Sequence, residues 1–292
     1  MAALAQQLPA VTQLVVQTLA GVRDLECDNT APPLRKPVTP NPDPLERPSE
    51  QVIQSAMQKA PPAEGLPTAL APQLPALPPG DGYRVAIWGD SHLAAGFFTQ
   101  ELVKLLKLPA HAGRQPHALL PASMGRAGMR LPLRRSCVSS EWRHEPVYLG
   151  GEGAAAPGPG LVNMVSDQTG STLSWDLKSA SASPGNARVR ILYQQRASPM
   201  VLGIRVDGGV EQAVSLIEKV GPAVLELVAN QPISQVALRL IDGRFRFHGL
   251  ELVSNAPDAF QLDVFGYPGA TVAGWKAANP DYLASWFSER NY

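Results

Sequence analysis

Cysteine is scarce in this chain, which has only two cysteines among its 292 residues. Cys27 lies in the N-terminal segment, and Cys137 lies just after the first predicted α/β unit. A cysteine-based zinc site needs more ligands at closer spacing, so this kind of site is excluded. A single disulfide in an oxidising compartment and two unrelated free thiols both remain open.

The chain also lacks an excess of charge of either sign and any long apolar run. Its 25 basic residues balance 25 acidic ones, so nothing favours electrostatic capture of nucleic acid or of an anionic membrane. No apolar stretch approaches the ~20 residues that cross a bilayer, and the N-terminus has no secretory signal pattern. If the protein is exported, we therefore expect its signal to have been removed or to lie outside this numbering.

Two segments precede the first α/β pattern. Residues 1–30 carry apolar residues at helical spacing, which predicts an N-terminal amphipathic helix. The apolar positions are Leu4, Leu8, Val11, Leu14, Val15, Leu19, Val22 and Leu25. Residues 31–81 are rich in proline, with fourteen prolines between residues 31 and 80. Because each proline removes a backbone donor, we expect a linker there.

Regular structure is predicted to resume at residue 82. Tyr83–Trp88 is an apolar run typical of a buried strand, and it leads into the turn Gly89-Asp90-Ser91-His92. Apolar residues at helical intervals then predict a helix over Leu93–Leu106. An α/β fold begins with such a strand, turn and helix, so residues 82–132 are assigned to an α/β domain.

The pattern changes to short strands between residues 133 and 257. Turns at Asp207-Gly208-Gly209 and Asp242-Gly243 separate runs of alternating apolar residues, which is a strong hairpin signal. Eight short strands at roughly ten-residue spacing predict an all-β sandwich or jelly roll. The expected strands are Leu161–Ser166, Ser171–Leu177, Ala187–Tyr193, Val201–Val206, Val210–Leu216, Ala223–Val228, Gln235–Ile241 and Phe245–Val253.

The α/β pattern returns in residues 258–292. Gln261–Phe265 is a second short apolar strand, and Pro280–Arg290 is a predicted helix for which Asn279 is a suitable cap. The predicted fold class is therefore α/β, with the all-β module of residues 133–257 inserted between the first and second βα units.

Ser91 is a candidate for chemistry because it lies where a hydrophobic strand ends and a helix begins. Catalytic groups in α/β folds gather outside the carboxyl ends of the strands. The amides at the start of a helix favour negative charge there, such as an alkoxide or the oxyanion of acyl transfer. Serine is also a common helix cap, and on position alone a structural N-cap is the more frequent explanation.

Three sequence blocks occur in a consistent order: before the predicted β-module, in its last strand and after it. They are Val85–Phe98 with its Gly-Asp-Ser-His, Phe247–Leu252, and Val264–Thr271. The first and third resemble the first two blocks of the GDSL/SGNH hydrolase family, and the second resembles the strand that returns from an inserted module in similar proteins. The resemblance spans residues 82–292 and is nearest to bacterial peptidoglycan O-acetylesterases with a β-rich, carbohydrate-binding-like insert.

The resemblance implies a flavodoxin-like three-layer fold and a serine esterase mechanism. Ser91 would be the nucleophile, and its backbone N–H and that of Gly269 would donate hydrogen bonds in an oxyanion hole. Tyr267-Pro268-Gly269 also suits a type II turn, and both interpretations hold together because a turn aims the amide. Asp90 is expected to fix its turn, and the side chain of His92 is expected to diverge from Ser91.

The sequence departs from the family pattern after its second block. It contains no Asp-x-x-His, which supplies the family's general base and orienting acid, and no third block with an oxyanion asparagine. The remaining histidines, His111, His117, His144 and His248, are more typical of surface or packing positions. Two strands are also too few for a covered parallel sheet. Missing downstream sequence, a second chain and a truncated non-enzyme each explain this, and we expect one of the first two to supply the base.

The predicted function is a carbohydrate O-acetylesterase of the periplasm or cell envelope, with an acetylated glycan such as peptidoglycan as its partner and without metal or cofactor. The rivals are a non-catalytic glycan-binding or scaffold protein with a degenerate hydrolase half, and an acetyltransferase accessory protein on the same fold. Four aromatic residues of the β-module could stack on a pyranose ring, although aromatics in a sandwich are more often core. They are Trp142, Tyr148, Trp175 and Tyr193.

Overall fold

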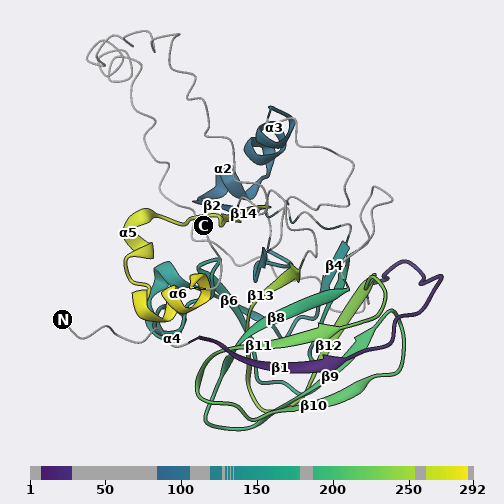
Figure 1. Cartoon of the computed structure of the whole chain (residues 1–292). Coiled ribbons are helices and arrows are strands. Elements are labelled where there is room, and N and C mark those ends of the chain that lie inside the picture. Colours follow the sequence, from purple (N-terminus) through teal and green to yellow (C-terminus); the bar gives the residue numbers. More distant parts are fainter. Residues whose placement is uncertain are drawn as a thin grey trace, which may run out of the picture. The chain divides into compact units, whose positions relative to one another are not determined.

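The computed structural model describes residues 8–27, 84–105, 119–126, 129, 131, 133, 135–177, 187–253 and 261–288 (Figure 1). Backbone hydrogen bonds arrange the strands in this part of the chain into three sheets. The linker predicted for residues 31–81 lies outside the described residues.

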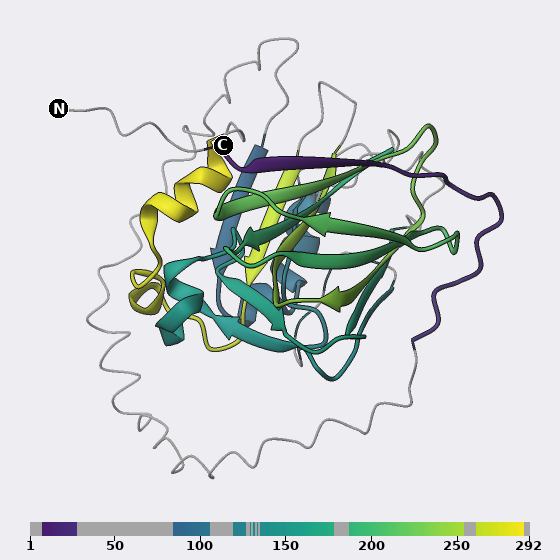
Figure 2. The same ribbon diagram turned by 90° about the horizontal axis from the view of Figure 1, so that it is seen from below.

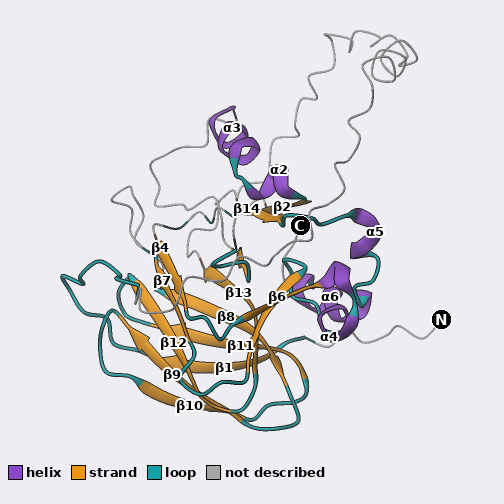
Figure 3. Cartoon of the chain, turned by 180° about the vertical axis from the view of Figure 1, so that it is seen from behind, coloured by secondary structure: helices purple, strands orange, loops and turns teal. Residues whose placement is uncertain are grey.

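Two of the sheets pack face to face as a β-sandwich (Figures 1 and 3). The larger sheet has the order β1-β11-β8-β13-β6-β5, and β3 also pairs with β13. It is mixed, because β1 pairs with β11 in parallel. Its strands are β1 (Ala10–Val15), β3 (Leu119–Pro121), β5 (Arg143–Pro146), β6 (Val162–Ser166), β8 (Arg188–Gln195), β11 (Gly221–Val228) and β13 (Phe245–Val253).

The smaller sheet of the sandwich is antiparallel, in the order β10-β9-β12-β7-β4. Its strands are β4 (Arg135–Val138), β7 (Thr172–Asp176), β9 (Met200–Val206), β10 (Gln212–Leu216) and β12 (Gln235–Asp242). All eight strands expected from the sequence are confirmed, whereas β1, β3, β4 and β5 were not anticipated. Every second side chain of a strand points into the core of the sandwich. In β12, for example, Val236, Leu238 and Leu240 are fully buried, and the residues between them are half-buried.

The N-terminal segment forms a strand, so the amphipathic helix predicted for residues 1–30 is wrong. β1 runs parallel to β11 from Ala10 opposite Ala223 to Val15 opposite Val228. Its residues alternate between half-buried and exposed, with Thr12 and Leu14 turned inward. The run Val-Thr-Gln-Leu-Val-Val is rich in β-branched residues, which suit a pleated edge strand better than a helix.

After β1 the chain crosses from the larger sheet to the smaller one (Figure 2). The carbonyl of Arg23 accepts a hydrogen bond from Gln235 Nε2 at 2.6 Å, and that of Leu25 accepts one from Arg135 Nη1 at 2.9 Å. A disulfide then joins Cys27 to Cys137 on β4, with the Cα atoms 5.3 Å apart. The alternative of two free thiols is therefore wrong, and the disulfide fits a protein of an oxidising compartment.

The third sheet contains two parallel strands, β2 (Arg84–Gly89) and β14 (Gln261–Gly266). β2 leads into helix α2 (Ser91–Ala94), and α3 (Phe97–Leu105) follows. The single helix predicted over Leu93–Leu106 is thus interrupted, because Gly96 adopts a φ of +77° that ends α2. After β14 come α5 (Val272–Trp275) and α6 (Pro280–Phe287), the latter capped by the side chain of Asn279 as predicted.

Helix α6 fills the space between the sandwich and the two-stranded sheet. Its Trp286 is fully buried against Phe265 of β14 and against Leu192 and Val224, which point away from the sandwich core. The indole N–H donates to the Pro157 carbonyl at 2.9 Å, close to the short helix α4 (Gly151–Ala155). A 3₁₀ turn, η1 (Val147–Leu149), precedes α4. The inserted module and the α/β units therefore share one apolar interface.

A buried carboxylate ties three strands of the larger sheet together on the face turned away from the core. Glu226 of β11 accepts hydrogen bonds from Gln13 Nε2 at 2.7 Å, Arg190 Nε at 2.7 Å and Arg188 Nη2 at 3.2 Å. Burial alone would raise the pKa of Glu226, but the bonds from Arg190 and Gln13 outweigh it and hold that pKa below its usual value. Glu226 therefore stays charged while it anchors β1 and β8.

Further ion pairs connect Arg190, a partner of Glu226, to the two-stranded sheet. Arg190 lies 3.8 Å from Glu251 of β13, which accepts a hydrogen bond from Arg84 of β2 at 3.3 Å. Arg84 Nε donates to the fully buried Asp263 of β14 at 2.7 Å, and Asp263 also accepts the backbone N–H of Leu119 at 2.9 Å. Removing one partner of such a buried pair typically costs about 3–5 kcal/mol, so this chain of ion pairs fixes β2 and β14 against the sandwich.

Removing the disulfide is expected to destabilise the fold. The double variant Cys27→Ser, Cys137→Ser frees a loop with a sequence separation of 110 residues, which should lower the free energy of unfolding by about 2–5 kcal/mol. Urea unfolding measures this loss. Wild-type protein kept in reductant should unfold at the same urea concentration as the variant, and equal stability of oxidised and reduced protein would contradict the expectation.

Acid is expected to destabilise the fold through His248. This β13 side chain is fully buried, stacks on Tyr282 and lies tilted against Trp286, and its burial holds the pKa well below the usual 6.5. Below about pH 6.5 the unfolded chain takes up a proton that the folded chain excludes, so stability falls by up to about 1.4 kcal/mol per pH unit from this group. Urea unfolding at several pH values between 7 and 5 gives the dependence of the unfolding free energy on pH. In His248→Phe this free energy should fall less steeply with decreasing pH than in the wild type, whereas the exposed control His92→Gln should follow the wild type.

Candidate active site at the strand-to-helix turn

The turn after β2 presents Ser91 to solvent. Asp90 is the N-cap of α2, since its Oδ1 accepts the backbone N–H of His92 at 2.9 Å. This hydrogen bond lowers the pKa of Asp90, so the cap remains ionised. Ser91 is the first residue of α2, is exposed, and makes no side-chain hydrogen bond to another described residue. The structural explanation of Ser91 as the cap is therefore wrong, because Asp90 has that position.

The turn after β14 presents the backbone of Gly269. Ala270 N donates to the Tyr267 carbonyl at 3.0 Å, and Gly269 between them has a φ of +83°. A proline followed by a residue with positive φ is the geometry of a type II turn, as the sequence predicts. Only glycine adopts this φ without strain, so the conformation that orients the Gly269 amide depends on this residue.

The two turns leave the same edge of the two-stranded sheet. Gly89 and Gly266 are opposite each other at the ends of the parallel strands, and Tyr267 N donates to the Gly89 carbonyl at 3.2 Å. A Cβ on Gly266 would lie 2.3 Å from Ala94 N, so β14 approaches the backbone of α2 directly. Ser91 and Gly269 are thus brought to one edge, although their catalytic roles remain predictions.

Tyr148 of the inserted module supports the Gly269 turn. Its hydroxyl donates to the Pro268 carbonyl at 3.4 Å, and its ring lies 6.0 Å from the ring of Tyr267. A Cβ on Gly274 of α5 would lie 2.4 Å from the Tyr148 Cβ, so the two segments are in close contact. The sequence suggested Tyr148 only as an aromatic of the module. Its contact with a turn 120 residues away has no local sequence signal.

Tyr267 adds a buried aromatic residue beside the same turn. Its hydroxyl is shielded from water without a hydrogen-bond partner among the described residues, and burial raises its pKa to about 12. The guanidinium of Arg126 lies over the ring, 5.3 Å from the centroid. The ring of His144 lies 6.5 Å from that of Tyr267, and its Nε2 lies 2.9 Å from the Met124 carbonyl oxygen.

None of the described histidines is bonded to Ser91. His92 has a side chain that is 92% exposed, with Nδ1 3.0 Å from Asp90 Oδ1. His144 is engaged with the Met124 carbonyl, and burial lowers its pKa. His248 is enclosed by aromatic rings. The remaining two histidines, His111 and His117, lie outside the described residues.

Three of the aromatic residues considered for sugar stacking are core residues. Trp142, Trp175 and Tyr193 are all buried in the sandwich, where Trp175 contacts Phe247 and Tyr193 stacks on Phe245. They have no face available to a ligand, so the packing interpretation is confirmed for them. Tyr148 is half-buried and engaged as described above.

Two further features are absent from the part of the chain that the structure describes. It includes no group of three or more histidine, cysteine, aspartate or glutamate side chains arranged to hold a metal ion. Among its helices, none combines the length and apolar character required to cross a bilayer.

Comparison with known proteins gives structural but not sequence relatives. No family model matches the chain, and no curated protein matches it significantly. Among solved structures it is similar to a peptidoglycan O-acetylesterase, with 17% identity and a TM-score of 0.51 over 71% of this chain and 53% of that one. The chain thus spans about half the length of that structure. At this identity the likeness shows the fold alone, which is a mixed α/β fold like that of the esterase.

Weaker similarities concern carbohydrate-binding modules. The C-terminal CBM6 of a marine laminarinase from Zobellia galactanivorans has 13% identity and a TM-score of 0.30, covering 47% of this chain and 98% of its own. CsCBM6-3 from Clostridium stercorarium, solved with cellobiose, has 7% identity and a TM-score of 0.32, covering 50% of this chain and 100% of its own. These scores are too low to support an argument about function.

The close contact at Gly266 gives a test of the geometry of this edge. Gly266→Ala should lower the free energy of unfolding by about 1–3 kcal/mol, because the added methyl group overlaps the backbone of α2. Gly153→Ala is the matched control: its Cβ would lie 3.3 Å from its nearest neighbours, and alanine gains up to ~1 kcal/mol of helix propensity in α4. Denaturant unfolding should show a clearly larger loss for Gly266→Ala, and equal losses would be evidence against the contact.

Proposed function

We propose that this chain is the nucleophile-bearing part of a serine ester hydrolase that removes O-acetyl groups from an envelope glycan such as peptidoglycan. The observation that carries the proposal is the shared edge of β2 and β14. Ser91, which is exposed and makes no side-chain hydrogen bond to a described residue, lies there beside Gly269 with its positive φ, on adjacent turns. The resemblance of Val85–Phe98 and Val264–Thr271 to the GDSL/SGNH blocks, and the fold shared with a peptidoglycan O-acetylesterase, point to the same activity.

In the proposed reaction, Ser91 Oγ attacks the carbonyl carbon of the acetyl ester. The carbonyl oxygen becomes an oxyanion and accepts hydrogen bonds from the backbone N–H groups of Ser91 and Gly269. Each such donor is typically worth ~10²–10³ in rate, because it is already oriented before charge develops. The sugar hydroxyl leaves, and water then releases acetate from the acyl-enzyme. Asp90 holds the start of α2, and Tyr148 holds the turn that carries Gly269.

The general base and its orienting acid are proposed to come from a continuation of the chain or from a second subunit. Support comes from the histidines, none of which is bonded to Ser91 in the described residues. Further support comes from the sheet: among the described strands, β2 and β14 each pair only with the other, and all six residues of β2 remain half-exposed. Further strands alongside would complete the proposed three-layer, flavodoxin-like arrangement.

The proposed organisation assigns residues 82–132 and 258–292 to the hydrolase and residues 133–257 to the inserted module. β1 and β3 extend that module, because both pair with its strands although they lie outside residues 133–257. The Cys27–Cys137 disulfide supports a periplasmic or envelope location, where such bonds persist. A non-catalytic glycan-binding protein is the rival outcome of the following test.

Covalent labelling of Ser91 tests the proposed activity. The 292-residue chain and the same chain with its native C-terminal continuation are incubated with a sulfonyl fluoride and, separately, with 4-nitrophenyl acetate. The longer protein should be labelled on Ser91 and hydrolyse the ester, and Ser91→Ala should lower hydrolysis by at least ~10³-fold. Ser140→Ala, which changes another exposed serine, should leave the rate unchanged.

The rival function has a distinct result. Absence of labelling and of hydrolysis in the longer protein, with glycan binding retained, would refute the esterase and leave the binding protein. Mass spectrometry of the labelled peptide identifies the modified serine, so labelling elsewhere in the chain would also count against Ser91.

A further inference from the structure

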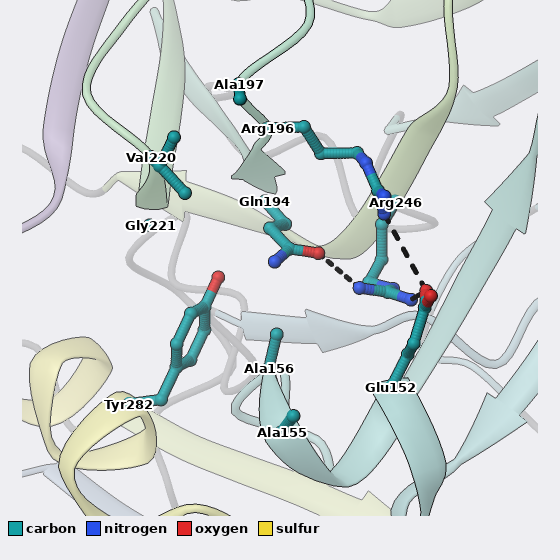
Figure 4. Close-up of a pocket in the computed structure, with 10 residues that line it drawn as sticks. All are labelled: Glu152, Ala155, Ala156, Gln194, Arg196, Ala197, Val220, Gly221, Arg246 and Tyr282. Carbon is teal, nitrogen blue, oxygen red and sulfur yellow. Dashed lines mark hydrogen bonds and ion pairs between the residues drawn. The ribbon is translucent and has the colours of Figure 1, made fainter.

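An open pocket lies where β8, β11 and β13 meet α4 and α6 (Figure 4). Its volume is about 470 Å³, within the range of small-ligand sites. The pocket shares no lining residue with the turns that carry Ser91 and Gly269. It is therefore a separate feature of the molecule.

Arg246 of β13 forms the floor of the pocket and is only 2% exposed. Its guanidinium donates to Glu145 Oε2 at 2.7 Å, to Glu152 Oε2 at 2.7 Å and to Gln194 Oε1. Burial alone would lower the pKa of Arg246, but the hydrogen bonds to Glu145 and Glu152 outweigh it and raise that pKa. The charged guanidinium thus holds Glu152 and Gln194 in fixed positions.

Three polar groups around this floor have unused hydrogen-bonding capacity. Since Arg246 occupies the Gln194 carbonyl oxygen, the Gln194 amide nitrogen faces the pocket and has no partner in the described part of the chain. The Tyr282 hydroxyl is directed toward the pocket from α6 (Figure 4); it is shielded from water and has no hydrogen-bond partner among the described residues. Among the described residues, all ion pairs of Glu152 use Oε2, so Oε1 is an available acceptor on a side chain that is 58% exposed.

Each charged side chain around the pocket lies within 3.7 Å of an opposite charge, and the remaining wall consists of small apolar residues. Arg246, Arg244 and Arg196 all contact Glu152, at 2.7, 3.2 and 3.7 Å. An anion would have to compete with this carboxylate, whereas a neutral ligand would leave the pairs intact. Ala155, Ala156 and Val220 add a wall of small apolar side chains.

We propose that this pocket binds one neutral sugar unit of a glycan through its hydroxyl groups. The Gln194 amide donates, Glu152 Oε1 accepts, and the Tyr282 hydroxyl does both, which matches the paired donor and acceptor character of neighbouring sugar hydroxyls. The small apolar wall leaves room for the ring. This site does not depend on the proposed esterase, and it gives the inserted module a role that its buried aromatics cannot have.

Sugar binding is tested on the Ser91→Ala chain, which cannot hydrolyse an ester through Ser91. Calorimetric titration with cellobiose, xylobiose and N,N′-diacetylchitobiose should give saturable binding of at least one disaccharide, and sodium acetate should not bind. Tyr282→Phe should weaken that binding roughly 3- to 10-fold, the usual effect of one lost hydrogen bond, with unfolding stability retained. Tyr193→Phe, the same change on the opposite face of β8, should leave the affinity unchanged.

A second variant blocks the pocket without touching the charged floor. Ala155→Trp fills it from an exposed position of α4 and should abolish binding in a folded chain. The proposal is overturned if no disaccharide binds, if acetate binds instead, or if Tyr282→Phe and Ala155→Trp bind like the parent. Sulfonyl fluoride labelling of the chain with its native continuation is recorded in parallel, so loss of sugar binding with intact Ser91 labelling counts against the pocket alone.

Discussion

A buried line of ion pairs sets the position of the candidate active site. It runs from Glu226 through Arg190 and Glu251 to Arg84 and Asp263, and so joins the larger sandwich sheet to β2 and β14. Two short parallel strands bury too little apolar surface to be stable on their own. Here the sandwich supplies Glu251 as a partner for Arg84 of β2, and it also supplies the apolar face beneath α6. The inserted module is therefore a structural support of the edge that carries Ser91.

Local patterns identified much of this fold from the sequence. Alternation and aspartate–glycine turns located the eight strands of the module, because hairpins are specified by neighbouring residues. The N-terminal segment was misassigned because a short run of valine, threonine and leucine fits both periods, and only pairing with β11 decides between them. β3 has only three residues, and it is a strand because it pairs with β13. Residues that lie next to it in the sequence do not specify this pairing.

The candidate site was predictable where it depends on local geometry. The turn at Gly269 and the strand-to-helix junction at Ser91 both follow from residue types at fixed spacing. Tyr148, Arg84 and Arg246 act through contacts with residues more than 90 positions away, and single charged or aromatic residues carry no sign of such partners. For this reason the pocket above Arg246 has no sequence signal, whereas three of the four aromatic residues suggested by the sequence belong to the core.

The disulfide between Cys27 and Cys137 closes a covalent ring that contains residues 27–137, Ser91 among them. A single peptide-bond cleavage anywhere from residue 28 to residue 136 would open this ring without dividing the molecule, since β1 would stay attached through the sulfur bridge. Separation of the fragments would then require a reductant as well as a protease. In an oxidising compartment, the segment that contains Ser91 is thus held at both ends.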